Sequence, residues 1–233
     1  RVEPTPDEEQ LSVVLQETPA LALLGCIQDS RIFQEKTVVD VVKEVFERAL
    51  GDRGRSIVDE DLDRVYERRE YVVQYDETSL HFLTRLCEEE GIFFYFDHET
   101  ETETLRLADG MGRLRRARPD AGGEVPYDER PDQAPDGEAV FGVLHRVEVG
   151  PTDVVVADHD WTHPTLDIRG TEVDHGEHSP PALEIFDHTD ALVFHSFDGQ
   201  QYGGHTAKIQ AKLRRERQDL ERQHWEAGST VIT

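Results

Sequence analysis

The sequence predicts a strand-rich α+β fold, and three neighbouring observations carry that prediction. Tyr71, Val73 and Tyr75 alternate with Val72 and Gln74, which is the spacing of a β-strand. Residues 79–90 then place apolar side chains every three or four positions, which is the spacing of a short amphipathic helix. The run 92–96 (IFFYF) follows directly, and five apolar residues in a row predict a strand buried on both faces or nearly so.

The helix in this unit has clear start and stop signals. Asp76 or Thr78 offers an N-cap side chain, and Glu77 is expected in the first turn, where the helix dipole favours an acid. Gly91 can adopt the left-handed conformation that ends a helix. The strand, the helix and the second strand are therefore joined by very short turns.

The acidic run 88–90 at the end of this helix opposes the helix dipole, which carries a mild cost. We therefore expect an arginine partner for these acids, either Arg69 or Arg85. Three consecutive helical positions project in different directions, so the run cannot form a paired catalytic acid and base. Cys87 faces inward on the same helix and, like Cys26, is expected to be a small buried apolar residue.

The composition excludes several classes of partner. The 233 residues include 50 acidic and 25 basic side chains, a net charge of −25, and such a field repels nucleic acid and anionic membranes. Mean hydropathy is −0.62, and no apolar run approaches the roughly 20 residues that span a bilayer. The opening RVEPTPDEEQ has neither an initiator methionine nor a signal peptide, so we expect a start within a longer protein.

The scarcity of lysine leads to a testable prediction about salt. Abundant Asp and Glu with few lysines are typical of proteins that fold in concentrated salt, where self-repulsion is screened. An ordinary acidic surface encoded by a GC-rich genome is the alternative. On the halophilic hypothesis, the free energy of unfolding from urea titrations rises between low and molar salt; an unchanged value would leave the ordinary acidic surface.

Other elements follow from the same signals. Thr37 and Asp40 have the spacing of a capping box, and the helix after them is expected to end at Gly51. Residues 51–68 are charged and predict a loop. Further strands are expected at 11–15, 104–108, 140–149, 153–158, 183–186 and 191–197, with an apolar run at 20–27 and a helix from 205 to about 217.

Three segments together resemble a known family. The central string from Arg69 to His98 and the earlier segment from Ser30 to Asp40 resemble the signature of VgrG proteins, and the segment from His159 to Asp167 resembles a turn of the same family. VgrG proteins are the spike-tip hubs of type VI secretion systems, related to baseplate hub and late control D proteins of contractile phage tails. The matching residues, to which the resemblance gives a structural role, are Arg31, Phe33, Gln34, Tyr71, Gln74, Tyr75, Glu77, Phe82, Arg85, Leu86, Glu88, Glu89, Glu90, Gly91, Tyr95, Phe96, Asp160 and Pro164.

The resemblance implies an architecture and a mechanical role. Residues 1–29 and 151–233 would supply antiparallel, barrel-like hub strands and a C-terminal helix, and residues 30–150 an inserted baseplate-like α+β module. The implied hub is a homotrimer that caps a tube of Hcp-like rings, contacts baseplate components and effectors, and helps to puncture a target membrane. It would assemble in the cytoplasm and be ejected, with no stable membrane insertion, no nucleic acid, no cofactor, no metal and no enzymatic activity. A phage tail or extracellular contractile-injection hub is the alternative within the same class.

A metal-dependent hydrolase is the alternative from a different class. Zinc needs three or four converging N, S or O ligands, and the chain contains three clusters of acids and histidines. Pro164 argues against the helix that would bring His159 and His163 to one face. The three clusters are Asp158, His159, Asp160 and His163; Asp174, His175, Glu177 and His178; and Asp187 and His188.

Overall fold

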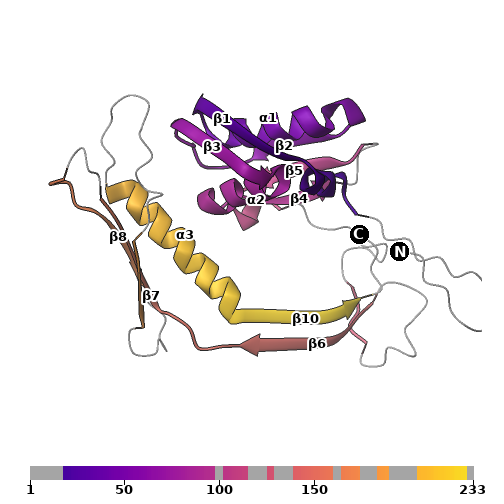
Figure 1. The fold of residues 1–233 in the computed structure, drawn as a ribbon. Helices are drawn as coiled ribbons and strands as arrows, with labels where there is room; N and C mark the ends of the chain where they lie inside the picture. The colour runs from indigo at the N-terminus through magenta and orange to yellow at the C-terminus, as the bar shows by residue number, and fades with distance from the viewer. Residues whose placement is uncertain are drawn as a thin grey trace, which may run out of the picture. The chain divides into compact units, whose positions relative to one another are not determined.

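The computed structural model describes residues 18–97, 102–114, 125–128, 139–159, 164–173, 183–188 and 204–229, and in it the chain divides into two compact units. Unit 1 comprises residues 1–110 and unit 2 residues 111–233. Both units combine several strands with one or two α-helices (Figure 1), which confirms the strand-rich α+β prediction.

Unit 1 contains a two-stranded ribbon, a three-stranded sheet and two helices. The strand β1 pairs antiparallel with β3, while β5 lies between β2, which runs parallel to it, and β4, which runs antiparallel. The strands expected at 92–96 and 104–108 form β4 and β5, which pair as an antiparallel hairpin. The elements are η1 (Ala20–Cys26), β1 (Gln28–Lys36), α1 (Val38–Leu50), η2 (Gly51–Arg53), β2 (Ser56–Asp61), β3 (Arg69–Thr78), α2 (Ser79–Glu90), β4 (Phe93–Asp97) and β5 (Thr104–Ala108).

Both predicted helices of unit 1 form, with the predicted caps. Thr37 and Asp40 make the capping box of α1, and Gly51 follows its last residue. Thr78 is the N-cap of α2, since its hydroxyl accepts a hydrogen bond from the His81 N–H, and Gly91 is left-handed with φ of 64°. The apolar faces of the two helices share one core with Phe33 and Val72 of the ribbon.

Two expectations about the central unit are wrong. Glu77 lies in β3, not in the first turn of α2, because ladder pairing with β1 continues to Thr78. The strand β4 is only half buried, since it lies at the edge of a three-stranded sheet; the central strand β5 is the fully buried one.

The segments that flank the helices also differ from expectation. The apolar run at 20–27 forms the 3-10 helix η1, which buries Leu21 and Leu24, three residues apart, on one side. Cys26 at its end is exposed, whereas Cys87 is buried, and burial raises the pKa of the Cys87 thiol to about 12. The presumed loop 51–68 contains β2, whose parallel pairing with β5 has no local sequence signal.

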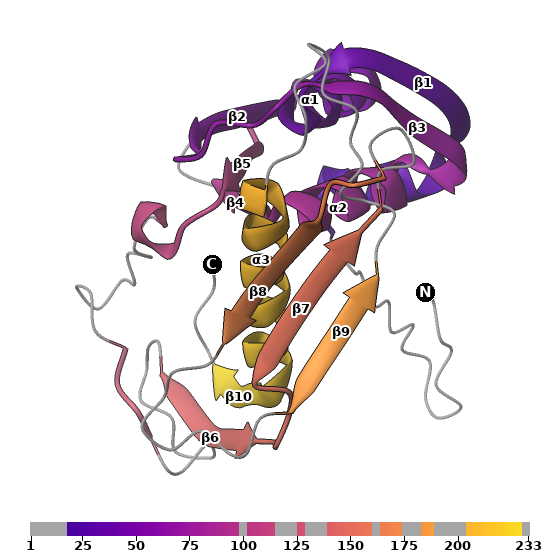
Figure 2. The same cartoon turned by 90° about the vertical axis from the view of Figure 1, so that its left-hand side faces the viewer.

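Unit 2 contains a three-stranded sheet, which one long helix covers, and it also contains a separate two-stranded ribbon. Figure 2 shows α3 running along the sheet, in which β7 pairs antiparallel with β8 and parallel with β9. Val154, Val156 and Ile168 pack there against Ala207 and Ala211. The elements are η3 (Met111–Arg113), β6 (Val140–Val147), β7 (Asp153–Asp158), β8 (Ile168–Val173), β9 (Glu184–His188), α3 (Gly204–Arg222) and β10 (Gln223–Ser229).

The helix α3 continues to Arg222, five residues beyond its predicted end. Ion pairs four residues apart stabilise its last turns, including Arg217 with Glu221 and Arg215 with Asp219. The strand β10 follows the helix and pairs antiparallel with β6. The described strands form open sheets of two or three strands, so the barrel stays a prediction. The domain boundaries near residues 29 and 150 also stay predictions. The strands expected at 11–15 and 191–197 lie outside the described residues.

Candidate functional site

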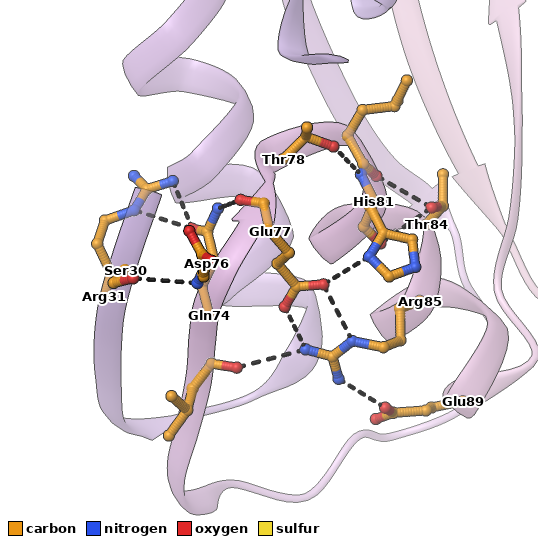
Figure 3. A network of polar contacts seen from close by, with 12 residues as sticks. Ser30, Arg31, Gln74, Asp76, Glu77, Thr78, His81, Thr84, Arg85 and Glu89 are labelled. Carbon is orange, nitrogen blue, oxygen red and sulfur yellow. Dashed lines mark hydrogen bonds and ion pairs between the residues drawn. The ribbon is translucent and has the colours of Figure 1, made fainter. Parts of the chain in front are cut away.

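The central family signature builds a polar network that ties the ribbon β1–β3 to the helix α2 (Figure 3). Arg31 and Gln74 lie opposite each other in the β1–β3 ladder. The side-chain oxygen Oε1 of Gln74 accepts hydrogen bonds from Arg31 Nε at 3.0 Å and from Arg31 Nη2 at 2.7 Å. The side-chain nitrogen Nε2 of Gln74 donates to the backbone oxygen of Glu77 at 3.0 Å. A fully buried glutamine therefore links β1 to the end of β3 that directly precedes α2.

The Glu77 carboxylate connects the end of β3 to the body of the helix α2. It accepts a hydrogen bond from Arg85 Nη2 at 2.7 Å, and His81 Nδ1 lies 2.7 Å from its other oxygen. Burial raises the pKa of Glu77, but the hydrogen bond and charge of Arg85, with a smaller contribution from His81, outweigh it and hold that pKa below its usual value. Arg85 also donates to the Val73 carbonyl oxygen at 3.3 Å, so it contacts β3 twice.

The acidic end of α2 has both of the expected arginine partners. Arg69, itself buried, donates to Glu89 at 2.9 Å and to Glu90 at 2.7 Å. Arg85 donates to the other oxygen of Glu89 at 2.9 Å, and so bridges Glu77 and Glu89. The predicted partnership is confirmed, and it offsets the unfavourable position of these acids in the helix dipole.

This geometry predicts how acid affects stability. Because the folded pKa of Glu77 lies below the ordinary 4.5, its contribution is present above that pH and is lost as pH falls through the folded pKa. Urea titrations at pH 7 and pH 3 should therefore give a Glu77→Gln variant that is less stable at pH 7 but loses less stability on acidification than the original chain. The exposed Glu70→Gln is the matched control. An unchanged pH dependence in Glu77→Gln would contradict the assignment.

A second polar cluster lies in the β2–β5–β4 sheet, and the sequence prediction missed it. Arg106, buried in β5, donates through Nε to Asp61 at 2.7 Å and lies 3.5 Å from Asp97. The Tyr95 hydroxyl donates to the same oxygen of Asp61 at 2.9 Å. A single arginine inside the apolar strand TLRLA was the available signal, because a buried charge requires partners.

The family-motif residues fall into three groups. Phe82 and Leu86 are core residues, and the Phe82 ring stacks on Phe33 with centroids 5.6 Å apart. A polar group, Arg31, Gln74, Glu77, Arg85, Glu89 and Glu90, makes the network above. The others are exposed (Gln34, Tyr71, Tyr75, Glu88 and Pro164), half exposed (Tyr95 and Phe96), at the helix end (Gly91) or outside the described residues (Asp160).

The structure lends no support to the metal-dependent alternative. Within the described ranges, no three or more His, Cys, Asp or Glu side chains converge as metal ligands. Asp158 Oδ1 accepts a hydrogen bond from the His159 backbone N–H, and Asp187 forms an ion pair with Arg214. The remaining cluster members, Asp160, His163, Asp174, His175, Glu177 and His178, lie outside the described residues.

Among the described helices, none is long and apolar enough to cross a membrane.

Solved structures place this fold among phage tail proteins. A 43 kDa tail protein of prophage MuSo2 from Shewanella oneidensis superposes with a TM-score of 0.53, covering 89% of this chain and 55% of that one, at 14% identity. A tail protein from Neisseria meningitidis gives a TM-score of 0.52, covering 87% of this chain and 53% of that one, at 11% identity. The chain therefore shares its fold with these two proteins.

Sequence comparison gives the family. The model of the phage tail baseplate hub (GPD) family matches residues 2–233, and the chain belongs to this family. The type VI secretion system spike protein VgrG1a of Pseudomonas aeruginosa is 33% identical over 84% of this chain and 29% of its own length. The actin cross-linking toxin VgrG1 of Vibrio cholerae is 31% identical over 67% of this chain and 14% of its own length. The resemblance to VgrG is confirmed, and the chain spans less than a third of the length of these relatives.

Proposed function

We propose that this chain is the hub segment of a spike protein in a type VI secretion machine. The observation that carries the proposal is the 33% identity with a named spike protein over 84% of the chain, together with the baseplate hub match over residues 2–233. In the full-length protein, three copies form a ring that caps a tube of Hcp-like rings. Sheath contraction then drives the tip, with its effectors, across a target membrane.

The chemistry of the described residues suits a mechanical role. Arg69 and Arg85 fasten the ribbon to the helix α2 through partly buried, charge-assisted hydrogen bonds, which are stronger than neutral ones. Such a network resists shear between β3 and α2 because several bonds must break together. On this proposal the segment has no substrate, no cofactor and no catalytic residue, and any enzymatic activity belongs to other parts of a full-length protein.

The proposal extends to domain organisation. Residues 1–29 and 151–233 would supply the hub strands that close into a barrel-like ring in the assembled trimer, and residues 30–150 the baseplate-like module. A neighbouring subunit would complete the open edges of the small sheets, since unpaired strand edges are otherwise sites of non-specific association.

Release from living cells tests the proposed function. Cells that make the full-length protein should release it into the medium when the contractile sheath is intact, and release should stop when sheath contraction is blocked. A cytoplasmic enzyme measured in the same medium controls for lysis. Release that does not depend on the sheath would contradict the proposal.

A phage tail or extracellular injection hub is the second candidate, favoured by the structural similarity to the two tail proteins. On that reading the protein would sediment from the medium within intact tail-like particles that also contain sheath and tube. Electron microscopy of the sedimented fraction separates this candidate from a secretion machine that stays in the cell.

A further inference from the structure

The outer face of the β1–β3 ribbon carries an uncharged patch in a chain of which 32% of the residues are charged. We call this the ribbon patch and define it as Ile32, Gln34, Tyr71, Val73 and Tyr75. Ile32 lies opposite Val73 and Gln34 opposite Tyr71 in the ladder, so these residues share one face. Figure 2 shows the ribbon curving along the outside of unit 1.

The patch is exposed although the opposite face of the ribbon is buried. The exposed fractions are 69% for Ile32, 55% for Tyr71, 39% for Val73 and 78% for Tyr75. The alternating residues Phe33 and Val72 supply the core contacts of the ribbon, so the fold does not require the patch residues. Contiguous exposed apolar and aromatic side chains mark interaction sites, and tyrosine is enriched where binding energy concentrates.

The residues that flank the patch give it an acidic rim. Glu35, Glu70 and Asp76 are exposed and directly follow or precede patch residues in the chain. Of the bases beside the ribbon, Lys36 pairs with Glu44 and Arg31 bonds to the buried Gln74, while Arg68 is exposed. An apolar centre with an acidic rim is complementary to an apolar centre with a basic rim.

We propose that the ribbon patch docks a different protein whose contact surface has an apolar centre bordered by lysine or arginine. The inference rests on the proposed function, because an assembled contractile machine supplies such neighbours. A second copy of this chain seated on this patch is disfavoured, since a shared patch would bring two acidic rims together.

Site-specific photocrosslinking in cells that make the full-length protein tests the docking surface. Benzoylphenylalanine replaces Tyr75 in one variant and Val65, which is 96% exposed and outside the patch, in the control. The position-75 variant should yield an adduct with another protein, at a peptide in which Lys or Arg borders apolar residues. Position 65 should yield none.

A charge pair at Gln34 tests the complementarity. Gln34 is exposed, so Gln34→Lys and Gln34→Glu should both keep the melting temperature of the original protein. Beside a basic rim, Gln34→Lys should reduce the position-75 adduct by about fivefold or more, whereas Gln34→Glu should preserve or increase it. Equal effects of the two substitutions would overturn the proposal.

The remaining outcomes are equally decisive. An adduct with a second copy, an adduct with residues 1–17 of the same chain, or no adduct would each overturn the docking proposal. Sheath-dependent release of the unlabelled protein is measured in the same cells. Normal release without the expected adduct refutes only the docking surface, whereas loss of sheath dependence refutes the proposed function itself.

Discussion

Replacing Phe82 with alanine should lower the free energy of unfolding of unit 1 by about 3–5 kcal/mol. Phe82 is fully buried, stacks on Phe33 and lies under the Arg85 guanidinium, whose central carbon is 5.4 Å from the ring centroid. The substitution leaves a cavity between α2 and the ribbon and removes a packing surface of the polar network. Urea titration followed by circular dichroism in molar salt measures the change.

Ile32→Ala is the matched control for this prediction. Ile32 lies in the ribbon but on its exposed face, so its truncation should change the free energy of unfolding by no more than about 0.5 kcal/mol. A loss below about 1 kcal/mol for Phe82→Ala would contradict the role of the family signature as the packing centre of unit 1. A large loss for Ile32→Ala would show that the ribbon patch serves folding instead of docking.

Gly170→Ala should destabilise unit 2 by at least about 2 kcal/mol, because the added methyl group would push the strand β8 away from the backbone of the helix α3. A Cβ atom added at Gly170 in β8 would lie 2.1 Å from the Ala207 carbonyl oxygen and 2.5 Å from the Lys208 nitrogen. Both are backbone atoms of α3, so no side chain can rotate away. Thermal unfolding followed by tryptophan fluorescence reports on this unit, since Trp161 and Trp225 both belong to it.

Gly112→Ala controls for the general effect of adding a methyl group in unit 2. Among the described residues, no atom lies within 4 Å of a Cβ at Gly112, so this variant should unfold at the temperature of the original chain or slightly above. Equal melting temperatures for Gly170→Ala and Gly112→Ala would mean that α3 does not pack against β8 as closely as described.

Elements with local signals were predictable from the sequence. Thr37 and Asp40 mark the start of α1, and Thr78 and Gly91 mark the two ends of α2; each signal lies at or next to the helix end that it predicts. The hairpin β4–β5 is likewise local. By contrast, β2 depends on a parallel partner more than forty residues away, and its two apolar residues give no clear period.

The site was predictable only in part. Dipole reasoning predicted an arginine partner for the acids of α2, because that argument needs only the position of the acids along the helix. It did not decide between Arg69 in β3 and Arg85 in α2, and the structure shows that both bind there. The link from Arg31 to Gln74 depends on the register of two strands forty residues apart, which the sequence does not specify locally. The exposure of Tyr71 and Tyr75 depends on which face of that ribbon packs on the core.

The molar mass of the full-length protein in solution tests the central claim most directly. Light scattering on a size-exclusion column, in molar and in low salt, should give three times the mass of one chain if this segment belongs to a trimeric spike hub. A monomer or dimer under both conditions would contradict the hub assignment.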